Sequence, residues 1–151
     1  MSAMNGTPSH VVVLFRPSAE ADDALREALQ LARSAGARLT VLTVAVVEPV
    51  NRRCCDIRSR YWNQVMHERA GEQLESAARL LGREPGVELA VASGSSIPSV
   101  LAREAAARGG DVIVVPRGAL PWFHPGARSL RRKVRRLGSC DVLELPAARA
   151  A

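Results

Sequence analysis

The residue types that could carry out catalysis occur in this sequence at spacings that complete no catalytic motif. Gly94-Ser95-Ser96 stands between a strand pattern and a helix pattern, as the serine of a nucleophile elbow does. Pro98, however, takes the place of the second glycine, and no Asp and His pair accompanies the serine. His67-Glu68 starts a zinc-protease motif whose second histidine would stand at Gly71. We therefore predict no catalytic residue, and at most a weak ATPase activity.

Metal and dinucleotide motifs are incomplete in the same way. The three histidines do not have the spacing of metal ligands, and Cys54 and Cys55 are adjacent, whereas a zinc knuckle needs two to four residues between its cysteines. Lys133 follows no glycine-rich loop, and the first strand-to-helix turn contains no glycine. We expect no metal site. Arginines beside Cys54 and Cys55 favour the thiolate, so a regulatory thiol stays open as an alternative to a plain surface loop.

The excess positive charge is confined to one short segment. The sequence has 21 basic and 15 acidic residues and a net charge of +6. Six of the basic residues lie between Arg128 and Arg136, where no acid occurs. The rest of the chain is therefore neutral, and a binding surface for an anion is expected at this segment rather than over the whole protein.

On a helix, the five arginines of this segment form one face opposite an apolar side made of Leu130, Val134 and Leu137. This face could bind phosphate or another polyanion, because arginine donates two parallel hydrogen bonds to phosphate. It could also be a solvated surface, as many charge runs are. Trp122 and Phe123 could stack on bases, but two aromatics flanked by prolines are more typical of a loop pinned to a core. We therefore expect a protein partner or an anion at this helix in preference to nucleic acid.

Strand and helix patterns alternate along the sequence. Five apolar, β-branched runs predict strands at 11–15, 39–47, 87–92, 111–115 and 140–145. Helical spacing predicts helices at 19–35, from about Trp62 to Leu81, from Pro98 to the Gly109-Gly110 pair, and at about 126–137. Continuous apolar strands that alternate with helices predict an α/β fold with a parallel sheet covered on both faces. Ligands of such sheets bind beyond the carboxyl ends of the strands, which points to the turns 16–18 and 116–125.

Length and composition favour one cytoplasmic domain. The chain has 151 residues, which is the size of a single domain. No apolar run approaches the roughly 18 residues of a membrane span, and the first ten residues lack the features of a targeting peptide. We expect a flexible tail at 1–10, a domain at 11–146 and a short tail at 147–151. Three cysteines make no disulfide framework and suit a reducing compartment.

The sequence from about Val11 to Leu145, most of the chain, resembles the universal stress protein family, most specifically in two segments. Residues 93–118 (SGSSIPSVLAREAAARGGDVIVVPRG) are similar to the family's third strand, third helix and fourth strand, and 128–145 (RSLRRKVRRLGSCDVLEL) to its last helix and strand. The resemblance implies a single Rossmann-like domain of the adenine nucleotide alpha hydrolase-like kind, with a five-stranded parallel sheet of order 3-2-1-4-5. It also implies a stress-response regulatory module that forms a homodimer through the last strand, 140–145.

Many members of this family bind ATP through a glycine pattern that this sequence meets in part. Val115, Gly118, Arg128 and Ser129 stand at its four positions, so only Gly118 and Ser129 agree. Arg16 replaces the acidic residue that ATP-binding members carry after the first strand. We therefore expect a degenerate phosphate-binding loop, at which ATP, another nucleotide or a phosphate is a possible ligand. Two alternatives stay open: ATP binding in the family manner, and a scaffold that binds a protein partner or a polyanion through the basic helix 128–136. The candidate site residues are Arg16, Pro17, Ser18, Val44, Arg117, Gly118, Arg128 and Ser129.

Overall fold

The structure, a computed structural model, describes residues 6–49, 57–117, 126–137 and 140–145, with the backbone alone at 126–129 and 137. Strands and helices alternate throughout these residues. The elements are β1 (His10–Leu14), α1 (Ala19–Ala35), β2 (Arg38–Val46), α2 (Ile57–Leu81), β3 (Val87–Gly94), α3 (Ile97–Arg108), β4 (Val112–Pro116), α4 (Gly126–Leu137) and β5 (Asp141–Leu145). Every predicted strand and helix is present, and most ends lie within one or two residues of the expected positions.

The five strands form one sheet of order β3-β2-β1-β4-β5, in which every neighbouring pair is parallel. The predicted α/β fold and strand order are therefore confirmed. β1 begins at His10, one residue inside the segment that we expected as the amino-terminal tail.

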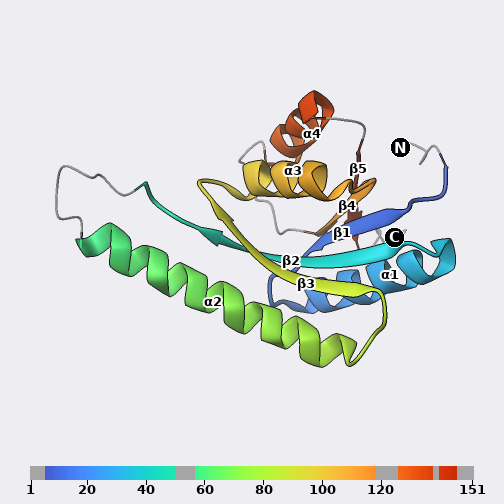
Figure 1. Cartoon of the computed structure of the whole chain (residues 1–151), viewed down its shortest axis with the longest axis horizontal. Helices are drawn as coiled ribbons and strands as arrows, with labels where there is room; N and C mark the ends of the chain where they lie inside the picture. The colour runs from blue at the N-terminus through green and yellow to red at the C-terminus, as the bar shows by residue number, and fades with distance from the viewer. Residues whose placement is uncertain (1–5, 50–56, 118–125, 138–139, 146–151) are drawn as a thin grey trace, which may run out of the picture.

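Helices cover both faces of the sheet (Figure 1). Val11 and Val13 of β1 pack with α1 and α2 on one face, whereas Val12 and Leu14 pack with α3 and α4 on the other. All five residues of β1 are buried, as they are in β4. A strand buried on both faces requires the continuous apolar runs that the sequence shows.

The first and third helices begin and end at residues suited to helix caps. Ser18 and Ser96 are the N-caps of α1 and α3, and each hydroxyl oxygen accepts a backbone N–H of the first turn. Gly36 and Gly109 end the same helices in the left-handed conformation, with φ of 65° and 67°. These caps position the turns that follow β1 and β3.

The expected packing of α2 is correct only for its second half. Ala70, Ala77 and Leu81 are buried, but Trp62 is 47% exposed although its spacing placed it on the apolar side. The first turns of α2 extend beyond the sheet in Figure 1. They are held there by Glu48, just after β2, which is hydrogen-bonded to Ser59 and Asn63. No helix in the described ranges is long and apolar enough to cross a membrane.

Candidate functional site

The turn after β1 places Arg16 at the carboxyl edge of the sheet. Leu14 pairs with Leu42 of β2, and the backbone N–H of Phe15 donates to the carbonyl of Leu42 at 2.9 Å. Arg16 follows as an exposed side chain. Val44 lies two residues beyond Leu42 on β2, half-buried on the α3 side of the sheet, so it stands close to the level of Arg16.

Arg117 reaches the same edge from β4. Val13 of β1 pairs with Val114 of β4, and Arg117 follows directly after Pro116, the last residue of that strand. The backbone N–H of Arg117 donates to the carbonyl of Leu145 at 2.8 Å, which fixes the main chain here, while the side chain is exposed. Two arginines therefore follow neighbouring parallel strands at one edge, where phosphate groups bind in folds of this kind.

Ser18 caps the start of α1 at this edge. Its hydroxyl oxygen accepts the N–H of Ala21 at 3.0 Å, and Glu20 and Asp22 in the first turn add negative charge near the helix start. The hydroxyl proton of a capping serine can still be donated to an anion. Pro17 and Ser18 are both exposed, so the turn from Arg16 to Ser18 is open to solvent.

The remaining predicted residues lie on α4 and in the loop before it. Arg128 and Ser129 belong to the first turn of α4, the helix that follows β4 and Arg117 in the chain. Gly118 and the side chains of Arg128 and Ser129 lie outside the described residues. Their part in ligand binding stays a prediction, as does the reactivity of Cys54 and Cys55, which also lie outside them.

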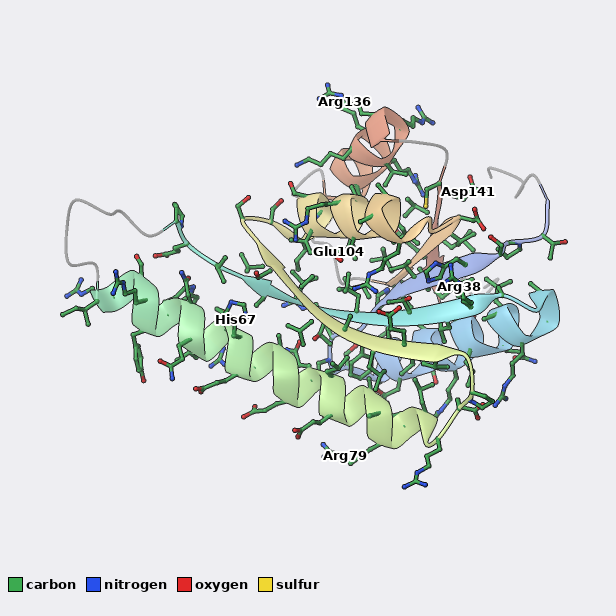
Figure 2. All side chains as sticks on the ribbon, in the orientation of Figure 1. Arg38, His67, Arg79, Glu104, Arg136 and Asp141 are labelled. Atoms are coloured by element: carbon green, nitrogen blue, oxygen red, sulfur yellow. The ribbon has the colours of Figure 1, made fainter. Side chains whose placement is uncertain are left out.

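Beyond its first turn, α4 has the amphipathic form that the sequence predicts. Leu130 and Val134 are buried, whereas the arginines of the outer face are exposed. Arg136 points away from the sheet (Figure 2). The exposed arginines are Arg131, Arg132, Arg135 and Arg136.

Lys133 connects α4 to the start of α3, a contact that sequence reasoning missed. Its ammonium group donates to the hydroxyl of Ser99, which also accepts the hydroxyl of Ser96 at 2.9 Å. The ammonium can only donate, so these three side chains fasten the two helices together. Lys133 is the one lysine of the sequence, and this was the only signal that could have drawn attention to it.

A second polar cluster lies at the opposite, amino edge of the sheet. His10 is 3% exposed; its Nδ1 lies 3.0 Å from the carbonyl oxygen of Arg108 and its Nε2 lies 2.7 Å from Oγ1 of Thr40. Arg108 forms ion pairs with Glu88 and Glu104. The hydrogen bond from Arg108 lowers the pKa of the Glu88 carboxyl. No motif in the sequence signals this cluster, because its members are far apart along the chain.

Asp111 links the starts of β1 and β4 at the same edge. One carboxylate oxygen accepts the N–H of Ser9 at 2.7 Å, the Ser9 hydroxyl at 2.5 Å and the N–H of His10 at 3.1 Å. The hydrogen bonds from Ser9 are the main cause that lowers the pKa of the Asp111 carboxyl. An acid at this place therefore holds the incoming chain against the sheet.

A small pocket of about 330 Å³ lies between α4 and β5. Arg131 and Arg135 line it together with the acids Asp141 and Glu144, and Cys140 lies at its wall. Burial raises the pKa of the Cys140 thiol to about 11. In the described ranges, no group of three His, Cys, Asp or Glu side chains is placed to hold a metal ion.

Comparisons with known proteins agree with this fold. The model of the universal stress protein family matches residues 8–143. A universal stress protein UspA from Lactobacillus plantarum is 18% identical, with a TM-score of 0.71, over 93% of this chain and 99% of that one. A family protein from Burkholderia pseudomallei is 24% identical, with a TM-score of 0.67, over 92% and 96%. No match to a curated protein was found.

A universal stress protein from Archaeoglobus fulgidus, solved in complex with dAMP, is 21% identical. Its TM-score is 0.56, over 90% of this chain and 95% of that one. At these identities the structural matches establish a shared fold.

Proposed function

Since this chain belongs to the universal stress protein family, we propose that it is a regulatory module of the cytoplasm that binds an adenine nucleotide or a related phosphate at the carboxyl edge of its sheet. The observation that carries the proposal is the convergence of Arg16 and Arg117, which follow neighbouring strands and are both exposed at that edge. The dAMP held by the Archaeoglobus fulgidus protein supports the ligand class.

The proposed site joins the turn 16–18, Val44 and Arg117 to the first turn of α4. Val44 would offer its backbone to the base, and the two arginines would face the phosphate. Gly118, Arg128 and Ser129 would complete the site from the loop and helix that follow β4. In this arrangement, arginine side chains replace part of the contact that glycine backbones make with phosphates in a standard loop. We propose binding without catalytic turnover, because no complete catalytic motif stands among the candidate residues.

Calorimetric titration of the whole chain with AMP, ATP and inorganic phosphate tests this site. Arg117→Ala and Arg16→Ala should each weaken AMP binding about tenfold or more, since a hydrogen bond to a charged group contributes about 1.5–3 kcal/mol. Arg83→Ala, an exposed arginine in the turn between α2 and β3, is the control and should leave binding unchanged. Absence of binding by both AMP and ATP at millimolar concentration would refute the proposal.

The comparison of ATP with AMP separates two forms of the proposal. If the loop after β4 holds a phosphate chain in the family manner, ATP should bind more tightly than AMP. If the loop is degenerate, only the first phosphate is held, and the two nucleotides should bind with similar affinity. Inorganic phosphate that competes with AMP at a similar concentration would indicate that the anion alone is recognised.

The exposed arginines of α4 favour a second candidate function, the docking of an acidic protein partner. Arg132 and Arg136 lie one turn apart on the exposed face, and α4 packs beside the edge strand β5. A homodimer formed through β5, 140–145, would bring the two basic faces close together. Arg132→Glu with Arg136→Glu should abolish retention on a polyanionic resin at low salt, whereas unchanged retention would exclude this face.

A further inference from the structure

β3 is an edge strand whose outer side is open. The order of the sheet places β2 on one side of β3 and no strand of the described chain on the other (Figure 1). Two of its apolar side chains, Leu89 and Val91, are each 40% exposed. An exposed edge with apolar side chains is a template for pairing with another chain, and proteins commonly protect such edges.

The pairing of β3 with β2 shows which of its backbone groups face outward. The N–H of Leu39 donates to the carbonyl of Gly86 at 3.2 Å, and the N–H of Val47 donates to the carbonyl of Gly94 at 2.9 Å. Backbone groups alternate in direction along a strand. The even-numbered residues from 86 to 94 therefore direct their N–H and C=O groups to β2, and the odd-numbered residues direct theirs outward.

One of the outward carbonyls already has a partner. The guanidinium group of Arg103 donates to the carbonyl of Ser93 at 2.7 Å, which closes the last position of the edge. Within the described chain, no hydrogen bond reaches the outward N–H and C=O groups of Val87, Leu89 and Val91. Donors and acceptors that alternate along an open strand are complementary to the backbone of an extended polypeptide.

The exposed apolar side chains lie on the face of the sheet that α2 covers. Leu89 pairs with Val41, which packs in the core on that face, and Val91 pairs with Thr43, whose hydroxyl donates to α2. A pocket of about 450 Å³ opens beside Leu89, with walls made mainly by Ala78, Leu81, Pro85 and Val87. The edge thus has an apolar groove between β3 and α2.

Gly71 leaves room in this groove for a further strand. It stands two turns before Ala78 on the same side of α2. A Cβ at Gly71 would have no atom within 4 Å. Glycine inside a helix is destabilising relative to alanine, and no contact of the described chain requires it here. A large side chain at this position would occupy the space that an added strand needs.

The groove has one unmatched cation, at its end beside the start of β3. Arg83 lines the pocket and is exposed, and among the described residues no carboxylate lies within ion-pair distance of it. The neighbouring Glu84 is already paired with Arg33. Glu75 is exposed one turn after Gly71, so it would repel an acid in the middle of the groove. An acidic group is therefore favoured only at the end beside Arg83.

We infer that this edge binds an extended segment of a partner protein, which joins the sheet as a sixth strand beside β3. The backbone of the segment pairs with Val87, Leu89 and Val91. Its alternate apolar side chains cover Leu89 and Val91 on the α2 face. The side chains between them lie on the other face, beside the ion pair of Glu88 and Arg108, and are polar. An acidic side chain at one end meets Arg83.

The charges and the symmetry favour a partner protein over a second copy of this chain. In an antiparallel pairing of two β3 strands, residues 93–99 of the second copy would lie opposite Arg83, and that segment contains no acid. Pairing of β3 with β5, the other edge strand, would join unlike edges of two copies. Such a contact does not close and builds an open filament.

Selection of displayed random peptides of about nine residues, with the whole chain as target, tests the inference. Enriched peptides should alternate apolar and polar residues and carry an acid at one end. Gly71→Leu should weaken the binding of an enriched peptide at least tenfold, because the new side chain fills the groove. Glu72→Leu, the same new side chain turned about 100° around α2, is the matched control and should leave binding unchanged.

Unfolding would not explain a loss of binding in Gly71→Leu, since leucine favours a helix more than glycine does and has open space at this position. Arg83→Ala should weaken the peptide about threefold, as expected for an exposed ion pair. Equal binding by Gly71→Leu and the natural chain, or enriched peptides without alternation, would overturn the inference.

Amide exchange measured by NMR identifies the contact directly. In the free chain, the amides of Leu89 and Val91 should exchange faster than those of Glu88 and Ala90, which are bonded to β2. Saturation with an enriched peptide should slow exchange at Leu89 and Val91 at least tenfold and leave Glu88 and Ala90 unchanged. Two results would overturn the inference: bound peptide that protects neither outward amide, or protection that grows with protein concentration when no peptide is present, which would place a second copy at the edge.

Discussion

Nε2 of His10 lies 2.7 Å from Oγ1 of Thr40, and both side chains are buried where β1 and β2 begin. The carbonyl oxygen of Arg108 can only accept, so Nδ1, 3.0 Å away, carries the proton that it donates. In the neutral ring Nε2 then accepts from the hydroxyl of Thr40, a contact much shorter than the 3.5 Å that separates this hydroxyl from the carboxylate of Glu88. This pair joins β1, β2 and the end of α3 at the amino edge of the sheet.

Thr40→Val should destabilise the fold by about 1–3 kcal/mol, because a buried ring nitrogen would lose its partner. Thr43→Val is a matched control on the same strand, since Thr43 is also fully buried and its hydroxyl donates to the carbonyl of Ala70 at 2.8 Å. That carbonyl belongs to α2 and keeps its helical partner, so the loss at Thr43 should be about 1 kcal/mol or less. If urea unfolding shows the same loss of unfolding free energy for both variants, the hydrogen bond from Thr40 to Nε2 of His10 contributes no more than an ordinary one.

The sequence predicts the framework of the fold well because the framework depends on local patterns. Val11 to Val13 are buried on both faces, and their unbroken apolar run is enough to predict a parallel strand. Ser18 and Gly36 mark the ends of α1 because a cap needs only a hydroxyl or a positive φ at one position. Such features are fixed by neighbours in the chain.

The features that the sequence did not predict depend on residues that are distant in the chain. His10 becomes buried because Thr40 and Arg108, 30 and 98 residues away, meet it when the strands align. Helical spacing assigns Trp62 to a face of α2 but cannot tell that the sheet ends before that turn. At the candidate site, Arg16 and Arg117 could be predicted to share an edge from strand order, whereas the contact of Lys133 with Ser99 required the packing of α4 on α3.

Asp111 should make stability depend on pH in the acid range. Its pKa is lowered in the folded state by hydrogen bonds from Ser9, so its contribution is present above the unfolded pKa of about 3.9 and is lost as the pH falls through the folded pKa. Asp111→Asn should therefore cost about 1 kcal/mol at pH 7, a value reduced because the carboxylate is partly exposed. The difference in unfolding free energy between the natural chain and Asp111→Asn should shrink as the pH falls below 3.

The control for this pH effect is Asp23→Asn. Asp23 is exposed and lies 3.8 Å from Arg26 on the surface of α1, so its loss should change stability by less than about 0.5 kcal/mol. Urea unfolding at pH 7 and pH 3 measures both variants. A loss at Asp111 that is the same at the two pH values would mean that the carboxylate charge contributes nothing.

Gly94 occupies a place where any side chain would collide with the core. A Cβ at this position would lie 2.5 Å from Cγ2 of Val100, which is fully buried. Gly94→Ala should therefore destabilise the protein by about 1–3 kcal/mol through overpacking. Gly71, inside α2, has no atom within 4 Å of such a Cβ, and Gly71→Ala should stabilise the protein by about 0.5–1 kcal/mol. In thermal unfolding, Gly94→Ala should lower the melting temperature and Gly71→Ala should raise it. A melting temperature that Gly94→Ala leaves unchanged would mean that α3 can move away from β3 at little cost in free energy.

Cys140 should be a slow nucleophile despite the basic helix beside it. Burial, and then the charges of Asp141 and Asp111, raise the pKa of its thiol to about 11. At pH 8 the thiolate fraction is then about one in a thousand, against about a quarter for a thiol with a pKa of about 8.5.

In a chain with Cys54→Ser and Cys55→Ser, alkylation of Cys140 should be on the order of a hundredfold slower when the chain is folded than in urea. The alkylation rate of the folded chain should rise about tenfold per pH unit up to pH 10. Asp141→Asn should speed the reaction at pH 8, because it removes a negative charge next to the thiol. A folded rate equal to the rate in urea would show that Arg131 and Arg135 offset both burial and the acids.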